Sequence, residues 1–238
     1  MVPPSASDGR PPTCEEPIFF RITRFILSML ITVIVLTTFP DFAFTAAKGN
    51  AGLPATSAEV AMLKWKSSFD NQSQSSLSTW QGKNACSNNW IGITCRQPGI
   101  VTDLALALVG LRGTLMDLDF VALPSLVNLD LSFNSFHGPI PSSIAKLSKL
   151  LTLDLSFNRL SGRIPLIIVG LTSLKNLNLN GNHFSGSIPK EIGMLKSLSD
   201  LVLSNNSLTG HIPNSIGNLG NLTFLYLWKN NLSEEIPQ

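Results

Sequence analysis

The amino-acid sequence predicts an α/β solenoid, in which each repeat adds one short parallel strand to a curved, horseshoe-like stack. Three observations lead to this prediction. The second half of the chain repeats with a period of 24 residues. Each period contains an alternating pair such as Leu129 and Leu131, which is the pattern of a strand with one buried face. Most periods also contain an apolar pair at i, i+3, such as Ile144 and Leu147, which suits a short helical turn.

The period is clearest when the chain is divided into repeats that begin at residues 124, 148, 172, 196 and 220. Leucine occupies three shared positions in every one of them. One repeat cannot bury its own leucines, so a stack of repeats is needed to form a core. A glycine such as Gly138 suits a turn with positive φ, and Ile140-Pro141 continues the chain in an extended conformation. An irregular repeat from Val101 to Leu115 precedes the five regular ones.

One polar position is shared by all five regular repeats and follows the predicted strand. A buried amide at this place can pair with loop backbone groups that would otherwise lack a partner. Stacked through the repeats, these side chains are expected to form a structural ladder. Its members are Asn134, Asn158, Asn182, Asn206 and Asn230.

The N-terminal segment has the three-part pattern of a secretory signal peptide. Arg21 and Arg24 precede an apolar stretch from Phe25 to Leu36, and small residues follow up to Ala47. Residues 1–47 are therefore predicted to be a signal peptide with an unusual polar leader, or else a signal anchor that is not cleaved. A linker over residues 48–56 is expected next. Both alternatives place the rest of the chain outside the cell.

The chain has three cysteines, Cys14, Cys86 and Cys95. The first lies in the leader, and the other two are expected to form a disulfide because an extracellular compartment is oxidising. A metal site would need about four ligands, and the sequence near these two cysteines offers no histidine or second cysteine pair. A nucleophilic thiol would need a histidine base and an oxyanion site, and neither is visible.

Residues 150–165 match the pattern LxxLxLxxNxLxGxIP at nearly every defined position. They resemble the plant-type leucine-rich repeat, which the Gly-x-Ile-Pro portion separates from other classes. The preceding segment, with Glu59, Trp65, Trp80, Cys86 and Cys95, resembles the plant N-terminal capping domain. The resemblance implies a small helical N-terminal cap over residues 57–98. It also implies a solenoid over residues 99–238, with one degenerate repeat and five repeats of 24 residues, the last of them incomplete.

Leader, cap and repeats together resemble the beginning of a plant leucine-rich-repeat receptor-like kinase ectodomain. The resemblance implies a protein of the secretory pathway, at the cell surface or in the apoplast, that binds a peptide or protein ligand, a co-receptor ectodomain or both. Because the sequence stops inside a repeat, we expect a fragment without transmembrane and kinase parts. Contact with a membrane is then expected only through a missing C-terminal segment or an uncleaved N-terminal anchor. The alternative is a secreted leucine-rich-repeat protein that acts as an inhibitor of wall-degrading enzymes, a decoy or a co-receptor.

Enzyme chemistry is not expected from this chain. The sequence shows no phosphate-binding loop, nucleophile elbow or kinase signature, and it predicts no cofactor and no metal. A net charge of +2 gives no indication of a nucleic-acid partner.

Candidate ligand contacts are the side chains that project from the open face of the strands, where polar aromatic residues and paired acids are favoured at interfaces. They are Asp130, Phe133, Asp154, Phe157, Asn178, Asn180, Tyr226 and Trp228. Asn-x-Ser/Thr triplets are acceptors of N-linked glycans in secreted proteins. The candidates for glycosylation are Asn71, Asn205, Asn221 and Asn231.

Overall fold

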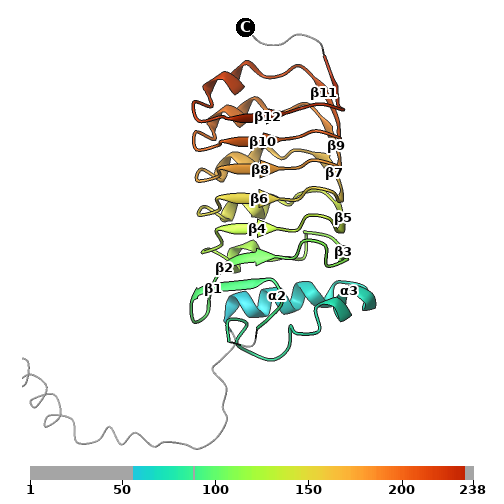
Figure 1. Ribbon diagram of the computed structural model, residues 1–238, viewed down its shortest axis with the longest axis vertical. Helices are drawn as coiled ribbons and strands as arrows, with labels where there is room; N and C mark the ends of the chain where they lie inside the picture. Colours follow the sequence, from blue (N-terminus) through green and yellow to red (C-terminus); the bar gives the residue numbers. More distant parts are fainter. Residues whose placement is uncertain (1–55, 88, 234–238) are drawn as a thin grey trace, which may run out of the picture. The chain divides into compact units, whose positions relative to one another are not determined.

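The computed structural model describes residues 56–87 and 89–233, and these form a stack of repeats on an N-terminal cap (Figure 1). The predicted signal peptide, the linker up to residue 55 and residues 234–238 lie outside the described residues. Among the described residues, no helix is both long and apolar enough to cross a membrane.

One face of the stack is a seven-stranded sheet in the order β1-β2-β4-β6-β8-β10-β12. Consecutive regular repeats pair in parallel and without slippage, so that Leu129 lies opposite Leu153 and Leu153 opposite Leu177. The parallel strands are β2 (Ile100–Ala105), β4 (Asn128–Asp130), β6 (Thr152–Asp154), β8 (Asn176–Asn178), β10 (Asp200–Val202) and β12 (Phe224–Tyr226). This is the parallel strand that the alternating leucines predict.

The structure adds a second, six-stranded sheet that the sequence pattern did not indicate. After each ladder asparagine the chain stays extended and pairs with the neighbouring repeat, with one apolar side chain such as Phe136 or Leu160 fully buried. Short segments with only one buried side chain are hard to recognise from periodicity. These strands are β3 (Arg112–Gly113), β5 (Ser135–Gly138), β7 (Arg159–Arg163), β9 (His183–Gly186), β11 (Ser207–Gly210) and β13 (Asn231–Leu232).

The predicted helical turns are 3-10 helices, and in the first four regular repeats each starts directly after the proline, whereas the one before them starts after Asp119. Proline suits this place because its φ is already close to the helical value and it has no N–H to leave unpaired. The helices are η1 (Phe120–Ala122), η2 (Ser142–Lys146), η3 (Leu166–Gly170), η4 (Lys190–Met194) and η5 (Asn214–Asn218). Each of the last four places one isoleucine in the core, as Ile144 does in η2.

The core is continuous along the stack, because each repeat covers the leucines of its neighbour. Leu129, Leu131 and their equivalents are fully buried through four regular repeats. Burial of one such side chain stabilises the fold by about 2 kcal/mol. In the last described repeat Leu225 takes the place of Leu129 and is 38% exposed. Stacking, and not the local sequence, therefore decides how much a leucine contributes.

The N-terminal cap begins with α2 (Ser57–Ser67) and α3 (Asn71–Ser76). Thr56 starts α2 through a reciprocal capping box with Glu59. Glu59 is itself buried, and its other carboxylate oxygen accepts a 2.6 Å hydrogen bond from the backbone N–H of Ala85. At the start of α3 the backbone N–H and the hydroxyl of Ser73 hold the pKa of Asp70 below its usual value.

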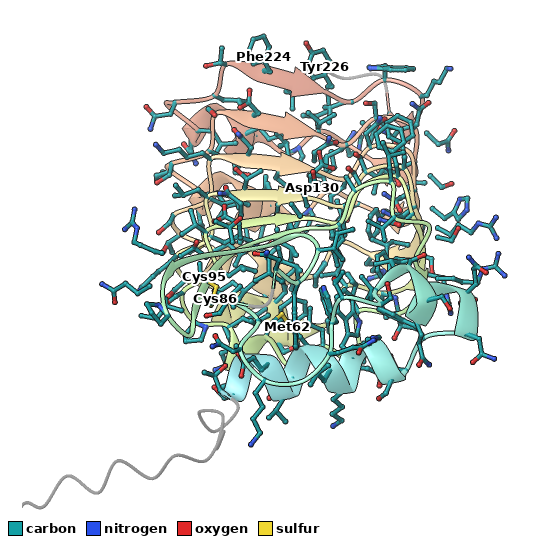
Figure 2. All side chains as sticks on the ribbon, turned by 60° about the horizontal axis from the view of Figure 1, so that its bottom comes forward. Met62, Cys86, Cys95, Asp130, Phe224 and Tyr226 are labelled. Atoms are coloured by element: carbon teal, nitrogen blue, oxygen red, sulfur yellow. A yellow bond between two sulfur atoms is a disulfide. The ribbon has the colours of Figure 1, made fainter. Side chains whose placement is uncertain are left out.

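The cap meets the first repeat through a strand, and a disulfide ties that strand to the rest of the cap. Strand β1 (Ile93–Gln97) runs antiparallel to β2 and ends the seven-stranded sheet. Cys86 and Cys95 are bonded, with their Cα atoms 5.6 Å apart (Figure 2). Gly92 is required beside them, since a Cβ there would lie 2.3 Å from the carbonyl oxygen of Ala105.

Candidate ligand-binding face

The asparagine ladder supports the edge of the open strand face. The Nδ2 group of Asn158 donates to the carbonyl oxygens of Leu131, Leu155 and Ser156, while its Oδ1 accepts from the backbone N–H of Phe136. Asn134, Asn182 and Asn206 make the equivalent four contacts in their own repeats, and Asn230 makes three of them. The ladder thus satisfies backbone groups of two neighbouring repeats at once.

Three acids lie on neighbouring strands of the open face, and we call Asp103, Asp130 and Asp154 the acid strip. One Oδ1 atom in each of Asp130 and Asp154 accepts hydrogen bonds from the backbone and hydroxyl of the serine two residues later. Strands β2, β4, β6, β8, β10 and β12 contain no lysine or arginine. Asp130 and Asp154 are therefore held in fixed orientations, and none of the three acids has a basic partner on these strands.

The amide side chains continue the polar surface toward the C-terminal repeats. Asn178 donates to Oδ2 of Asp154 at 2.9 Å, so it joins the acid strip. The Oδ1 atom of Asn180 accepts from Ser204 and from Asn205. Two further acids of this face were not among the predicted contacts: Asp103, and Asp200 on β10, which stands at the place before the first leucine. Their signal was the same alternation, because the residue before that leucine also faces outward.

Two predicted ligand contacts form an aromatic pair at the loop edge of this face. The rings of Phe133 and Phe157 stack with centroids 4.3 Å apart, and the side chains remain 48% and 44% exposed. Both residues have positive φ, like Leu108, Asn205 and Lys229 at the equivalent places. A left-handed backbone favours glycine or asparagine over a bulky side chain. Except for Asn205, these residues therefore occupy this position against the local backbone preference.

Leu108 offers a direct test of that strain, because its side chain is 76% exposed and has little packing to lose. We expect Leu108→Asn to stabilise the protein by about 1 kcal/mol, since asparagine tolerates its φ of 60°. Chemical denaturation of both proteins measures the difference. Met116→Asn, at a similarly exposed site without positive φ, is the matched control and should give no gain. Equal effects of the two changes would contradict the strain argument.

The other two predicted contacts lie in the last described repeat. Tyr226 stacks beside Phe224 with ring centroids 6.2 Å apart, and both lie at the end of the stack in Figure 2. Trp228 packs instead under the ammonium group of Lys229, 5.0 Å from the ring centroid. The structure therefore places these two side chains in separate pairs, several strands away from the acid strip.

The four glycosylation candidates lie at different places on the stack. Asn71 is exposed at the start of α3, and Asn231 is exposed in β13. Asn221 is exposed and donates to the carbonyl oxygen of Lys196. Asn205 is half-buried at the loop edge of the open face.

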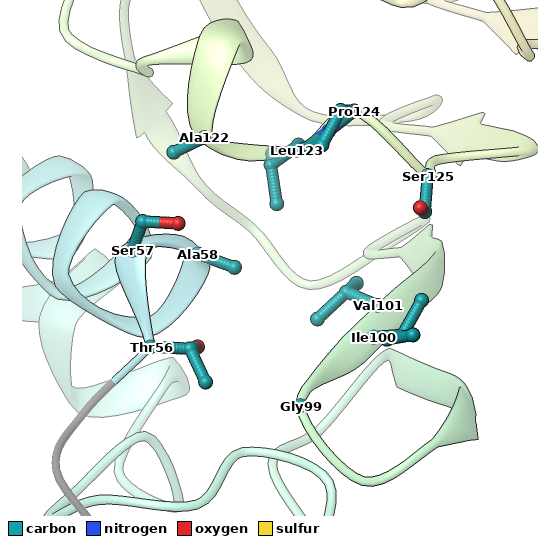
Figure 3. Close-up of a pocket in the computed structure, with 10 residues that line it drawn as sticks. All are labelled: Thr56, Ser57, Ala58, Gly99, Ile100, Val101, Ala122, Leu123, Pro124 and Ser125. Carbon is teal, nitrogen blue, oxygen red and sulfur yellow. The ribbon is translucent and has the colours of Figure 1, made fainter.

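One cavity of about 140 Å³ lies where the start of α2 meets β2 and η1 (Figure 3). Its walls include Ser57, Ala58, Val101, Leu123 and Pro124, and none of the residues that line it is titratable. Nor do the described parts of the chain bring three or more metal-ligating side chains together. The cavity therefore lacks the groups that acid–base chemistry would require.

Family models match three parts of the chain. The leucine rich repeat N-terminal domain matches residues 57–96, and leucine rich repeat models match residues 124–184 and 197–219. The chain is 42% identical over 129 residues to MDIS1-interacting receptor like kinase 2 of Arabidopsis thaliana. That alignment covers 53% of this chain and 11% of the relative. The chain thus spans about a tenth of the length of the curated receptor kinases that it matches.

Solved structures show the same similarity. The BIR2 ectodomain from Arabidopsis thaliana superposes with a TM-score of 0.68 at 28% identity, over 76% of this chain and 96% of that one. The receptor kinase HAESA ectodomain from the same plant, solved with a peptide hormone ligand, gives a TM-score of 0.57 at 28% identity, over 76% and 34% of the two chains. The chain therefore contains a leucine-rich-repeat N-terminal domain followed by leucine-rich repeats, and both are similar to those of plant receptor kinase ectodomains.

Proposed function

We propose that this chain is part of the ectodomain of a plant leucine-rich-repeat receptor kinase. The protein passes through the secretory pathway to the cell surface and binds a peptide or protein ligand outside the cell. The observation that carries the proposal is the acid strip on the open strand face of a receptor-type solenoid. The relatives reported above match in the cap and repeats, and one of them was solved with a peptide hormone. Those relatives give no support to the alternative of an inhibitor of wall-degrading enzymes.

The chemistry of the strip favours a basic group on the ligand. Asp130 and Asp154 lie side by side on paired strands, and the bound serines hold their carboxylates in place. An extended peptide that crosses the strands can place an arginine or lysine between them, because guanidinium and ammonium groups donate to two carboxylates at once. The side-chain amide of Asn180 and exposed backbone groups of the protein can form hydrogen bonds with the backbone of the bound peptide.

The test uses the full chain, secreted from plant cells, and synthetic decapeptides in which each position in turn is arginine, alanine or glutamate. We expect arginine at one position to strengthen binding. The double variant Asp130→Asn and Asp154→Asn should weaken that peptide by about tenfold, because a held ion pair contributes about 1 to 2 kcal/mol. Asparagine keeps the shape and an acceptor for the serine, so the fold should be unchanged.

Asp200→Asn is the matched control, because it removes an acid from the same face two repeats beyond Asp154. It should leave the affinity of the arginine peptide unchanged. Equal affinity for the arginine and glutamate peptides would contradict the proposal. So would equal effects of the double variant and the control on the affinity for the arginine peptide.

A further inference from the structure

A row of exposed apolar side chains follows the loop edge of the open face. Leu108, Phe133 and Phe157 stand at equivalent places of three consecutive repeats, and we call them the apolar ridge. The backbone joins these places, because the N–H of Leu108 donates to the carbonyl oxygen of Ser132 and the N–H of Phe133 donates to that of Ser156. The three side chains are 76%, 48% and 44% exposed. Large apolar side chains that lie exposed side by side mark interaction sites, whereas single ones need no explanation.

The backbone of the ridge is strained at each of its three residues. Their φ angles lie between 51° and 60°. A left-handed backbone costs free energy at a bulky residue, and such strain clusters where a protein binds or acts. Stability does not explain the cost at Leu108, because its side chain has little packing in return. In the next three repeats the same place holds Gly181, Asn205 and Lys229. Apolar side chains therefore occupy this place only in the first three repeats.

The apolar ridge and the acid strip belong to the same three repeats. Each repeat that contributes Asp103, Asp130 or Asp154 to the strip also contributes one side chain to the ridge. Asp130 precedes Phe133 by three residues, and Asp154 precedes Phe157 by three. Their Cα atoms are therefore at most about 11 Å apart. Neighbouring strands are about 4.8 Å apart, so the ridge crosses three repeats within about 10 Å beside the acids.

We propose that the apolar ridge binds large aliphatic side chains of the same peptide whose basic residue binds between Asp130 and Asp154. This inference rests on the proposed function and adds the second half of the ligand. Neighbouring side chains of an extended peptide point to opposite sides. When the peptide crosses the strands between strip and ridge, with its arginine toward the strip, the residues next to the arginine point toward the ridge. The ligand is therefore a peptide in which large apolar residues flank a basic one.

The charge beside the ridge decides between possible occupants. A second copy of this chain that docked through the same face would bring acid strip against acid strip, and like charges across an interface disfavour association. A peptide with a positive charge next to its apolar side chain instead gains from both parts of the face. The acids thus select among the apolar partners that the ridge alone would accept.

The experiment uses the full chain secreted from plant cells and decapeptides that keep arginine at the position where it strengthens binding. Leucine or alanine is placed at every other position in turn, and isothermal titration calorimetry measures each Kd. Next to the arginine, leucine should bind about tenfold more tightly than alanine, because it buries apolar surface against the ridge. Two positions away the side chain points toward the strip, so leucine should bind no more tightly than alanine there.

Variants of the ridge test the contact itself. The double variant Phe133→Asn and Phe157→Asn should reduce the advantage of leucine next to the arginine to below twofold and leave the alanine peptide unchanged. Asparagine tolerates the positive φ of both places. A leucine three positions from the arginine, on the side of the first repeat, reaches Leu108. Leu108→Asn should remove the advantage of that leucine although it stabilises the fold, so the loss of binding cannot come from a damaged structure.

Met116→Asn is the matched control, since it removes an exposed apolar side chain that is not part of the ridge. It should leave every affinity unchanged. Binding that depends on arginine but shows no preference for leucine next to it overturns this inference and leaves the proposed function standing. A leucine preference that persists in the double variant also overturns it. If no arginine peptide binds, both fail.

Discussion

Asn158→Ala is expected to lower the free energy of unfolding by about 3 kcal/mol, because it leaves buried backbone groups without partners. The Asn158 side chain is only 7% exposed, and it bonds to three carbonyl oxygens and one N–H. The N–H of Phe136 and the carbonyl of Leu131 belong to the preceding repeat, so the loss weakens the contact between repeats. Urea unfolding of the full chain, followed by circular dichroism, measures it.

Asn158→Asp separates hydrogen bonding from shape. The carboxylate can still accept from Phe136, but it faces three carbonyl oxygens with no hydrogen to donate. We expect a loss at least as large as that of the alanine variant, from repulsion and desolvation of the charge. Asn178→Ala on the open face is the control, with an expected loss below about 1 kcal/mol. A small effect of both Asn158 changes would show that the ladder contributes little.

Trp65→Ala is expected to lower the free energy of unfolding by about 4 kcal/mol, because it opens a cavity where the cap meets the repeats. The ring is fully buried and stacks on Phe136, with centroids 5.6 Å apart. Its Nε1–H donates to the carbonyl oxygen of Thr114 at 2.9 Å, and Phe69 packs against its edge. Equilibrium unfolding monitored by tryptophan fluorescence and circular dichroism measures the loss.

Trp65→Phe keeps an aromatic ring and removes the hydrogen bond and part of the volume, so about half of the loss is expected. Val60→Ala, on the exposed side of the same helix, is the control and should change stability by less than about 0.5 kcal/mol. If Trp65→Ala behaved like that control, the cap would not be held to the repeats through this ring.

The sequence by itself determined the repeated part of this protein. The alternation at Leu129 and Leu131 predicted the strand, and the spacing of Ile144 and Leu147 predicted the helical turn. These predictions succeed because each repeat has the same neighbours as the next, so one local pattern describes the environment of all. The asparagine position could be interpreted for the same reason. A buried amide after every strand has only loop backbone to pair with.

Only the tertiary structure decided which outward side chains meet. Asp130 and Asp154, and likewise the rings of Phe133 and Phe157, come together because neighbouring strands pair in register across repeats. The second sheet also depends on this pairing, since its strands are too short to show a period of their own. The leucine pattern marks which residues can be buried, whereas the stacking of repeats decides how far they are buried and which outward side chains become neighbours.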